Sequence, residues 1–372
     1  MKVFITVVFI FLVFISVQAQ QNDSLKNDSL AKIIEQELQN QNTIEPVRSS
    51  PSTNPNIGVI GDFQGSYLSN ATRNYNAYIN EAEFSFQSEI DPYARADFFY
   101  SVGRTETGGF ESGIEEGYLT TLSLPAHLQL KVGKFKSALG RINPVHAHAL
   151  AFISLPSAYE NYFGEGINDE GLQLNWLVPN SAFYQLLTVQ LTDGPLDCPS
   201  FSRSKTNQYL SLAHLKNFFD INDNSTLEIG FSGIYGANDS NLVTTVAAGD
   251  LTYKWKPIRF NTYKSFTLQS EVFFSNKQLK IDSTIHSVGW YAMMNFQFAK
   301  RWFFTGIYSY SNLPNDAQYV QQSYSGTIGW YATEFQKIEL EGKTVTSNSE
   351  KQYYQALLRW IFVIGAHGAH QY

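Results

Sequence analysis

The chain has 372 residues, of which 16% are charged and 15% are aromatic, with 28 Phe and 22 Tyr. Its 26 Lys and Arg against 33 Asp and Glu give a formal net charge of −7, which excludes the basic surface typical of nucleic-acid binding. The single cysteine, Cys198, excludes a disulfide framework, so the fold must be closed by backbone hydrogen bonds.

The N-terminal segment, residues 1–19, has the features of a secretory signal peptide. Lys2 gives a short positive start, an almost unbroken apolar run extends from Val3 to Val17, and Ala19 supplies the small residue before a cleavage site. The apolar run is shorter than the roughly twenty residues of a spanning helix. We therefore expect a cleaved signal rather than a membrane anchor, and an exported protein.

Residues 20–55 differ in composition from the rest of the chain and are rich in Gln, Asn and Ser. One stripe of apolar residues has helical spacing: Leu30, Ile33, Ile34 and Leu38. Such a segment is typical of a disordered linker, with a short self-associating helix as the alternative. We interpret it as a polar periplasmic extension.

From residue 56 to residue 372, stretches of about ten residues alternate between apolar and polar side chains. In residues 81–87 the odd positions are polar and the even positions apolar, so a strand here has one charged and one apolar face. Charged and amide residues recur on the polar face in strand after strand, where a dry core could not hold them. The pattern predicts an all-β fold, a transmembrane antiparallel β-barrel with an apolar exterior and a polar interior.

About sixteen strands are expected, an even number as in bacterial outer-membrane barrels. They lie near residues 57–67, 80–90, 93–103, 113–123, 127–136, 168–177, 182–192, 207–217, 225–236, 246–256, 262–274, 286–298, 301–311, 323–333, 335–346 and 352–366. Tight turns alternate along the chain with longer gaps, among them 275–285 and 312–322. Short turns at one rim and long loops at the other are typical of barrels in the outer membrane of a Gram-negative bacterium, where lipid surrounds the wall.

The gap at residues 137–167 is the longest, and a structureless loop of this length is normally functional. The interior of a sixteen-stranded barrel is wide enough for water, so we predict that this loop folds inward and forms a pore constriction. The residues expected at this constriction are Lys134, Lys136, Arg141, Asn143, Glu160, Glu165, Asp169 and Glu170.

Charged residues on the polar faces of the strands are expected to line the pore. They are Glu81, Glu83, Arg95, Asp97, Lys131, Glu271 and Arg359. The mixture fits an anion channel, a field of opposed charges that orients polar solutes, or pairs that only strengthen the wall. The sequence therefore does not decide the ion preference or the solute.

Two histidines in the long loop, His146 and His148, are two residues apart, so in extended backbone both point the same way. This is a plausible start of a metal site, with zinc as the candidate ion and further ligands from Glu160, Glu165, Asp169 or Glu170. The alternative is that both imidazoles only hydrogen-bond the loop to the wall.

Three segments around the loop resemble a known family: Val132–Lys136, Gly140–His148 and Asn168–Leu174. They are similar to outer-membrane proteins of Bacteroidota and Proteobacteria labelled zinc-regulated TonB-dependent outer-membrane receptors, and at longer range to the phosphate-selective porins. Asn54–Ile57, Gly61–Phe63 and the ending Gly365–His370 extend the resemblance over most of the barrel. It implies an outer-membrane transport protein.

The expected function is a porin-like channel for small hydrophilic solutes or ions, and the alternative is a substrate-binding or zinc-linked uptake receptor. The roughly thirty-six residues after the signal are too few for the plug of a TonB-dependent receptor, which favours the porin. Serines near the histidines, such as Ser154, form no nucleophile elbow or ordered triad, so no enzyme is predicted. A homotrimer is one expected assembly, and the terminal aromatic Tyr372 suggests recognition by the barrel-assembly machinery.

Overall fold

The computed structural model describes residues 54–71, 74–105, 108–179, 182–203 and 208–365. The signal peptide, nearly all of the polar extension and Tyr372 lie outside these residues, so the predictions made for them stay predictions. In the described part of the chain, no helix has both the length and the apolar character needed to cross a bilayer.

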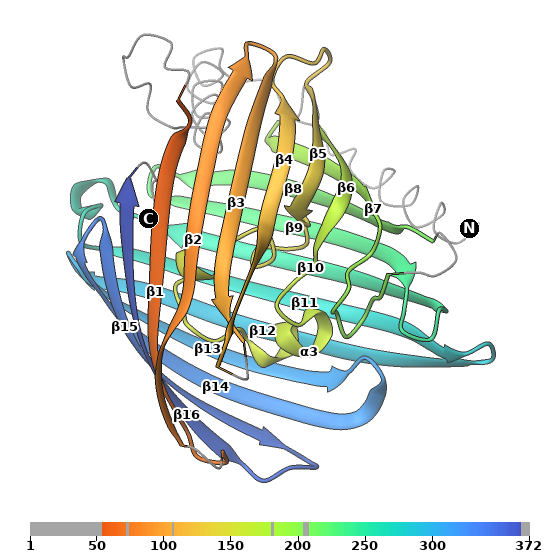
Figure 1. Cartoon of the computed structure of the whole chain (residues 1–372), viewed down its shortest axis with the longest axis vertical. Helices are drawn as coiled ribbons and strands as arrows, with labels where there is room; N and C mark the ends of the chain where they lie inside the picture. The colour runs from red at the N-terminus through yellow and green to blue at the C-terminus, as the bar shows by residue number, and fades with distance from the viewer. Residues whose placement is uncertain (1–53, 72–73, 106–107, 180–181, 204–207, 366–372) are drawn as a thin grey trace. The chain divides into compact units, whose positions relative to one another are not determined.

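Sixteen antiparallel strands form one closed barrel, which confirms the predicted fold class (Figure 1). The strands are β1 (Asn56–Leu68), β2 (Tyr75–Asp91), β3 (Ala94–Arg104), β4 (Phe110–Thr121), β5 (Leu128–Lys136), β6 (Asn168–Leu177), β7 (Tyr184–Thr192), β8 (Leu210–Asn222), β9 (Ser225–Ala237), β10 (Val243–Trp255), β11 (Ser265–Lys280), β12 (Ser283–Ala299), β13 (Trp302–Leu313), β14 (Asp316–Thr333), β15 (Gln336–Ser347) and β16 (Tyr353–Gly365). Each strand pairs with its sequence neighbours, and β1 pairs with β16 from Gly58 opposite Gly365 to Leu68 opposite Gln355. This last pairing removes the free edges that an open sheet would expose to lipid.

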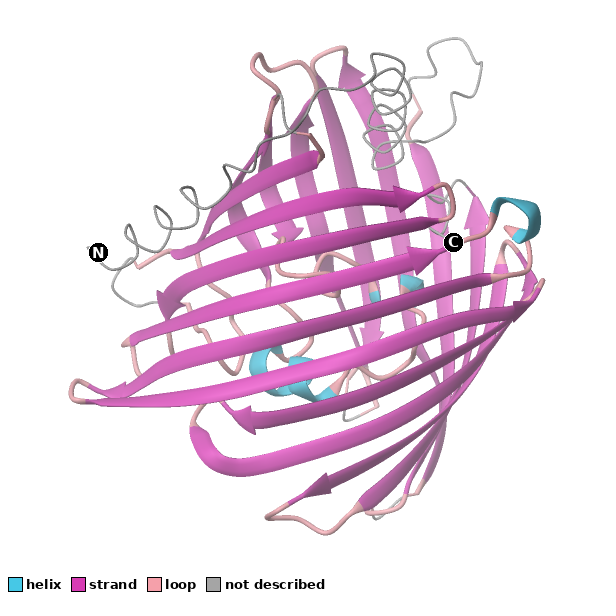
Figure 2. Cartoon of the chain, turned by 180° about the vertical axis from the view of Figure 1, so that it is seen from behind, coloured by secondary structure: helices cyan, strands magenta, loops and turns pink. Residues whose placement is uncertain are grey.

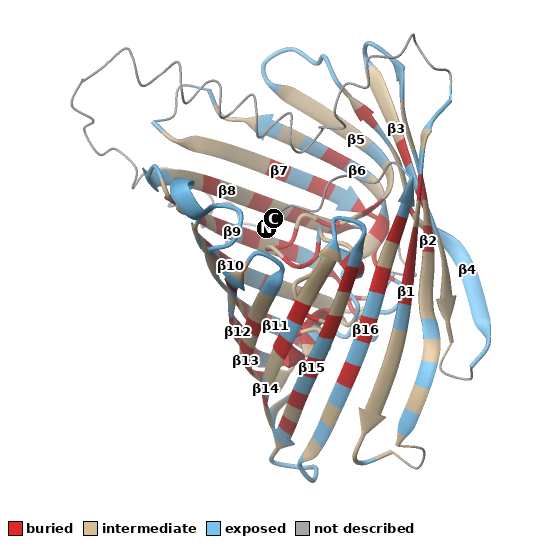
Figure 3. Cartoon of the chain, turned by 90° about the vertical axis from the view of Figure 1, so that its left-hand side faces the viewer, coloured by how far each residue is buried: buried red, intermediate tan, exposed pale blue. Residues whose placement is uncertain are grey.

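Side chains alternate between the two faces of the wall, as the banding of exposed and buried residues in Figure 3 shows. On β16, Leu358 is 50% exposed on the outside, whereas the neighbouring Arg359 is 1% exposed on the inside. On β11, Phe274 is exposed and Glu271 is buried. Large apolar side chains face outward around the whole barrel, where acyl chains would cover them.

Several predicted gaps are shorter than the sequence pattern indicates. β11 continues to Lys280 and β12 begins at Ser283, so most of the predicted gap 275–285 is strand. Likewise β13 and β14 reach Leu313 and Asp316. Polar residues predominate in these strand ends, so the apolar alternation that marks a strand in lipid is lost although the backbone pairing continues.

The chain between β5 and β6 lies inside the barrel, as predicted (Figures 1 and 2). It contains a 3₁₀ turn, η1 (Ala147–Ala149), and a short helix, α3 (Ser157–Phe163); a second 3₁₀ turn, η2 (Ile258–Phe260), lies between β10 and β11. One face of α3 is fully buried, and the ring of Phe163 meets Phe273 of β11 edge-on at 5.0 Å between ring centroids. The segment therefore packs an apolar face against one side of the inner wall.

Candidate functional site

The inward loop, residues 137–167, is closed at its base by the side chain of Asn143. Its Nδ2 donates hydrogen bonds to the carbonyl oxygens of Ser137 (2.7 Å) and Ile167 (2.9 Å). Its Oδ1 accepts from the backbone N–H of Ile167 (2.7 Å) and from the hydroxyl of Tyr159 (2.6 Å). One buried amide thus joins both stems of the loop to its helix, in the manner of a compact Ω-loop.

Two glycines let the loop approach its partners. Gly166 has φ +122°, and a Cβ there would lie 2.8 Å from Oδ1 of Asn143. Gly140 has φ +55° and lies against the carboxylate of Glu271, where a Cβ would collide. Both positions need a residue without a side chain and with access to positive φ.

Carboxylates of the wall accept the N–H groups of the loop backbone. Glu271 of β11 accepts from the amides of Arg141 and Ile142, both at 3.0 Å, and from the hydroxyl of Tyr291 (2.6 Å). Glu341 of β15 accepts from the amide of Ile153 (2.8 Å). Hydrogen bonds to a charged acceptor contribute about 1.5–3 kcal/mol each, so these contacts hold the loop firmly.

Cations on the neighbouring wall bind the loop carbonyls. Arg359 of β16 donates to the carbonyl oxygens of Ala147 (3.1 Å) and Phe152 (2.8 Å), and it forms a buried ion pair with Glu339 at 2.6 Å. Lys337 of β15 donates to the carbonyl oxygen of Leu150 (2.9 Å). The polar groups of a buried loop backbone require such partners, and the inner wall provides them.

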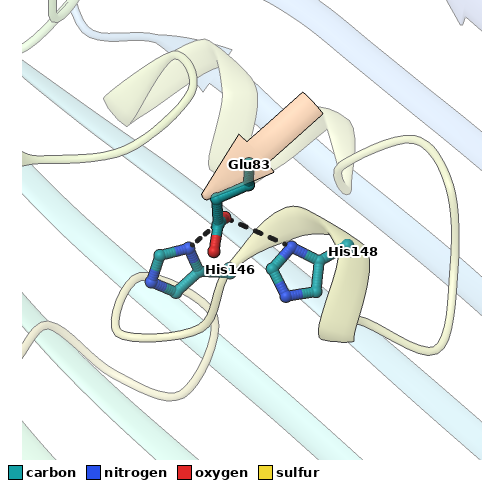
Figure 4. A group of neighbouring side chains, drawn as sticks. All are labelled: Glu83, His146 and His148. Atoms are coloured by element: carbon teal, nitrogen blue, oxygen red, sulfur yellow. Dashed lines mark hydrogen bonds and ion pairs between the residues drawn. The ribbon is translucent and has the colours of Figure 1, made fainter. Parts of the chain in front are cut away.

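A third attachment joins the loop to β2 and β4 through His146, and Figure 4 shows its contact with Glu83 of β2. Its Nδ1 lies 3.0 Å from Oε2 of Glu83, and its Nε2 lies 2.7 Å from Oε1 of Glu116. Burial by itself would lower the pKa of His146, but hydrogen bonds with Glu115, Glu116 and Glu83 outweigh burial and hold this pKa well above its usual range. His146 is therefore an imidazolium among carboxylates at neutral pH.

His148 lies beside His146 and faces the same carboxylate. Its Nδ1 is 3.5 Å from Oε2 of Glu83, and the two imidazole rings are 5.4 Å apart between centroids. Donor atoms of Glu83, His146 and His148 lie within 4.8 Å of one another, as do those of Glu81, Glu83 and Glu115. In the described residues these are the groups with the donor types and spacing of a metal site.

The further acidic ligands expected from nearby sequence lie elsewhere. Glu160 is 60% exposed and 3.9 Å from the ammonium of Lys343. Asp169 is buried and accepts from Arg203 at 3.1 Å. Glu165 is exposed. The carboxylates that do meet the histidines come from β2 and β4, which are distant in sequence.

The structure places Lys134 and Glu170, both expected at the constriction, on the outward face of the barrel. Lys134 is opposite Gly117 and Glu170 in the sheet, and Gly117 is opposite the exposed Phe98. Residues directly opposite one another share a face. Neither side chain contributes to a constriction inside the barrel.

The other residues expected at the constriction lie in the loop or in the strands at its two ends. Arg141 pairs with Glu228 of β9 at 3.1 Å, and Lys136 pairs with Glu115 at 3.0 Å. Asn143 is buried as the closure described above. Of the loop residues with a described ion pair, Glu160 has the most exposed side chain.

The seven residues expected to line the pore lie on inward faces. Glu81 and Glu83 are on β2, Arg95 and Asp97 are paired at 2.7 Å on β3, Lys131 of β5 lies over the ring of Tyr118, and Glu271 and Arg359 bind the loop. Sequence reasoning missed that Glu341, Lys337 and Lys343 hold the loop and that Glu339 pairs with Arg359, which also holds it. Nothing local in the sequence indicates a partner almost two hundred residues away.

Comparison with known proteins supports the fold. No family model matches the chain. An uncharacterized protein of Aquifex aeolicus (strain VF5) is 29% identical over 352 aligned residues, which cover 82% of this chain and 71% of that protein.

Solved structures that resemble the barrel are outer-membrane proteins. The anion-selective porin from Comamonas acidovorans matches with a TM-score of 0.59 and 7% identity, covering 83% of this chain and 98% of the porin. The outer membrane channel DcaP of Acinetobacter baumannii has a TM-score of 0.56 at 11% identity, with 83% and 96% covered. OpdQ of Pseudomonas aeruginosa has a TM-score of 0.52 at 11% identity, with 84% and 99% covered.

These likenesses concern the fold, and they do not extend to the receptor label of the family that the sequence resembles. TonB-dependent transporters have barrels of about twenty-two strands with a plugged lumen, whereas porins have sixteen to eighteen. With sixteen strands in a closed barrel, an apolar exterior and a loop folded inward, the chain has the fold of the outer-membrane porins of Gram-negative bacteria.

Proposed function

We propose that the protein is an outer-membrane channel for small hydrophilic solutes or ions, narrowed by the loop at residues 137–167. The observation that carries this proposal is the attachment of that loop across the inner wall, from Glu83 on β2 to Glu271 on β11 and Arg359 on β16. A sixteen-stranded barrel encloses enough space for water, and a firmly held inward loop narrows that space.

The polar inner wall supports passage of hydrophilic solutes. Charged groups of both signs face inward, and many of them are engaged by the loop or by each other. Side chains that stay accessible, such as Glu160 on α3, would meet a passing solute. Electrostatics of this kind sets ion preference in pores.

Conductance in planar lipid bilayers tests the proposal. Purified wild-type protein should insert and produce uniform current steps that scale with salt concentration. Heat-denatured protein at the same detergent concentration is the control and should produce none. Folded barrels that insert but show no steps at any voltage would refute a channel. Swelling of liposomes in sugars of increasing size would then give the size limit.

Two finer expectations stay proposals. A zinc-linked uptake receptor would need a cargo site open to the pore, whereas Glu83 and His148 are only 2% and 4% exposed. We therefore favour a site that keeps its ion over a site through which zinc passes.

A homotrimer is the other expectation, and a structure of OmpT of Vibrio cholerae is described as a trimer form. Cross-linking in the native membrane would test this assembly.

A further inference from the structure

Where the loop meets β2 and β4, two imidazoles converge on a buried carboxylate. We propose that Glu83, His146 and His148 bind one divalent transition-metal ion that fastens the inward loop to the barrel wall. The donor atoms come from two segments that are far apart along the chain, β2 and the loop. This inference does not depend on whether the barrel conducts.

The distances fit one shared ion. Oε2 of Glu83 lies 3.0 Å from Nδ1 of His146 and 3.5 Å from Nδ1 of His148. Oε1 of Glu115 lies 3.6 Å from the same Nδ1 of His146. Donors bound tetrahedrally at about 2.1 Å from an ion lie about 3.4 Å from one another. The donors of Glu83, His146 and His148 lie within 4.8 Å of one another, so these three need small adjustments to reach one centre.

The carboxylates have coordination capacity that the described protein groups do not use. Oε1 of Glu83 and Oε2 of Glu115 are buried without a hydrogen-bond partner, and Glu83 is 2% exposed. Figure 4 shows the Glu83 carboxylate directed between the two rings. Leaving a buried carboxylate oxygen unpaired is costly, and a cation at this point would satisfy it.

The negative charge of the carboxylates around these residues also favours a bound cation. Glu81 and Glu83 on β2 and Glu115 and Glu116 on β4 face this corner. The ion pairs of Glu83, Glu115 and Glu116 come from Lys136, His146 and His148. A divalent ion would supply two positive charges to this cluster of carboxylates.

Glu116 contacts His146 through the ring nitrogen that faces away from Glu83. It bonds Nε2 of the ring at 2.7 Å while Nδ1 faces Glu83, so the ring orientation is fixed with Nδ1 toward the proposed ion. A carboxylate on the distal nitrogen of a ligating histidine is the usual support of such sites. Glu116 is thus a positioning residue and not a ligand.

The donor set indicates the class of metal. Two imidazoles with carboxylates suit zinc, cobalt, nickel or ferrous iron, whereas calcium and magnesium prefer oxygen-only sites. Without a thiolate in the group, cuprous copper is disfavoured. We therefore expect tight binding of Co(II), Ni(II) and Zn(II) and weak binding of Ca(II).

Calorimetry and absorption spectroscopy on the folded full-length barrel test the site. After chelator treatment and dialysis, wild-type protein should bind about one equivalent of Zn(II), and Co(II) should give visible d–d bands. Glu83→Gln, which keeps the side-chain shape, and His148→Ala should each weaken Zn(II) binding more than about 100-fold. Glu116→Gln should weaken it about 10–100-fold, the range for supporting residues.

His286→Ala is the matched control because His286 is exposed and contacts Asn276 at the end of the wall. It should bind as wild type does. Wild-type protein that binds none of Zn(II), Co(II) and Ni(II) would overturn the proposal. So would Zn(II) binding that is unchanged by Glu83→Gln and His148→Ala in barrels with wild-type circular dichroism. A channel without a metal site and a metal site without a channel are thus separate outcomes.

Discussion

The side-chain amide of Asn143 donates to the carbonyl oxygen of Ile167, 24 residues further along the chain, and so closes the inward loop on itself. The same side chain also bonds Ser137 and Tyr159. The loop therefore has a rigid base that does not depend on the wall, while its middle depends on wall charges. The two kinds of contact can be tested separately.

Asn143→Ala should loosen the base of the loop. The substitution leaves buried backbone groups at Ser137 and Ile167 without this partner, at a cost of about 1–3 kcal/mol for each unsatisfied group. Hydrogen exchange across residues 138–166 should speed up strongly. Asn222→Ala, at an exposed turn where Oδ1 accepts the backbone N–H of Asn224, should leave exchange in the loop unchanged. Equal protection in both variants would contradict the assigned role of Asn143.

Glu271→Gln should release the first part of the loop from β11. The carboxylate holds the amides of Arg141 and Ile142, and a neutral acceptor would weaken bonds that contribute about 1.5–3 kcal/mol each. Single-channel recordings should show larger or noisier steps than wild type. Glu350→Gln, an exposed change between β15 and β16, is the comparison. Identical recordings for both would mean that this contact does not restrain the pore.

Glu160→Lys should shift ion preference toward anions. Glu160 carries an exposed carboxylate on α3 inside the barrel, where a reversed charge acts on passing ions. The reversal potential in a potassium chloride gradient measures the shift. Glu170→Lys makes the same charge change on the outward face and should leave the potential near the wild-type value. Matching shifts in the two variants would place Glu160 away from the ion path.

The thiol of Cys198 should react slowly in the folded barrel. Burial raises its pKa to about 11, so at pH 8 it is protonated, and the reactive thiolate forms only as the pH approaches 11. Iodoacetamide labelling at pH 8 should be much slower in folded than in denatured protein. Because its sulfur lies 3.7 Å from the carbonyl oxygen of Tyr162 in α3, Asn143→Ala should speed this labelling.

Leu358→Arg should impair membrane insertion. Leu358 is exposed on the outside of β16, and an arginine near the bilayer midplane costs about 2–4 kcal/mol. Folding yield into lipid vesicles measures the effect. Gln355→Arg places the same side chain on the inward face of the same strand and should fold more efficiently. Equal yields would argue against lipid at the outer surface.

The barrel could be predicted because its cause is local and repeated. Alternation in β11 and β16 already separates outward Phe274 and Leu358 from inward Glu271 and Arg359, and tight turns fix antiparallel order. The same rule would have placed Lys134 outward with Val132. Because Lys134 is close to the long loop in sequence, a role at the constriction was expected instead. Closeness in sequence does not show on which face of a strand a side chain lies.

The loop contacts could not be predicted because they join residues that are far apart along the chain. His146 was recognised as a candidate ligand, but its partner Glu83 is 63 residues earlier, and Glu341 is 188 residues from the amide that it binds. The spacing of His146 and His148 indicated that they act together. Only closure of the barrel brings β2 and β4 to them.

The wall holds the loop mainly through the loop's backbone. Glu271 and Glu341 accept hydrogen bonds from its N–H groups, and Lys337 and Arg359 donate to its carbonyl oxygens. Peptide groups are the same for every amino acid except proline. Replacements of accessible loop side chains should therefore leave the path of the backbone intact. Related barrels can therefore differ in the solutes that pass through them by substitution of a few accessible loop residues, with no compensating substitution in the wall.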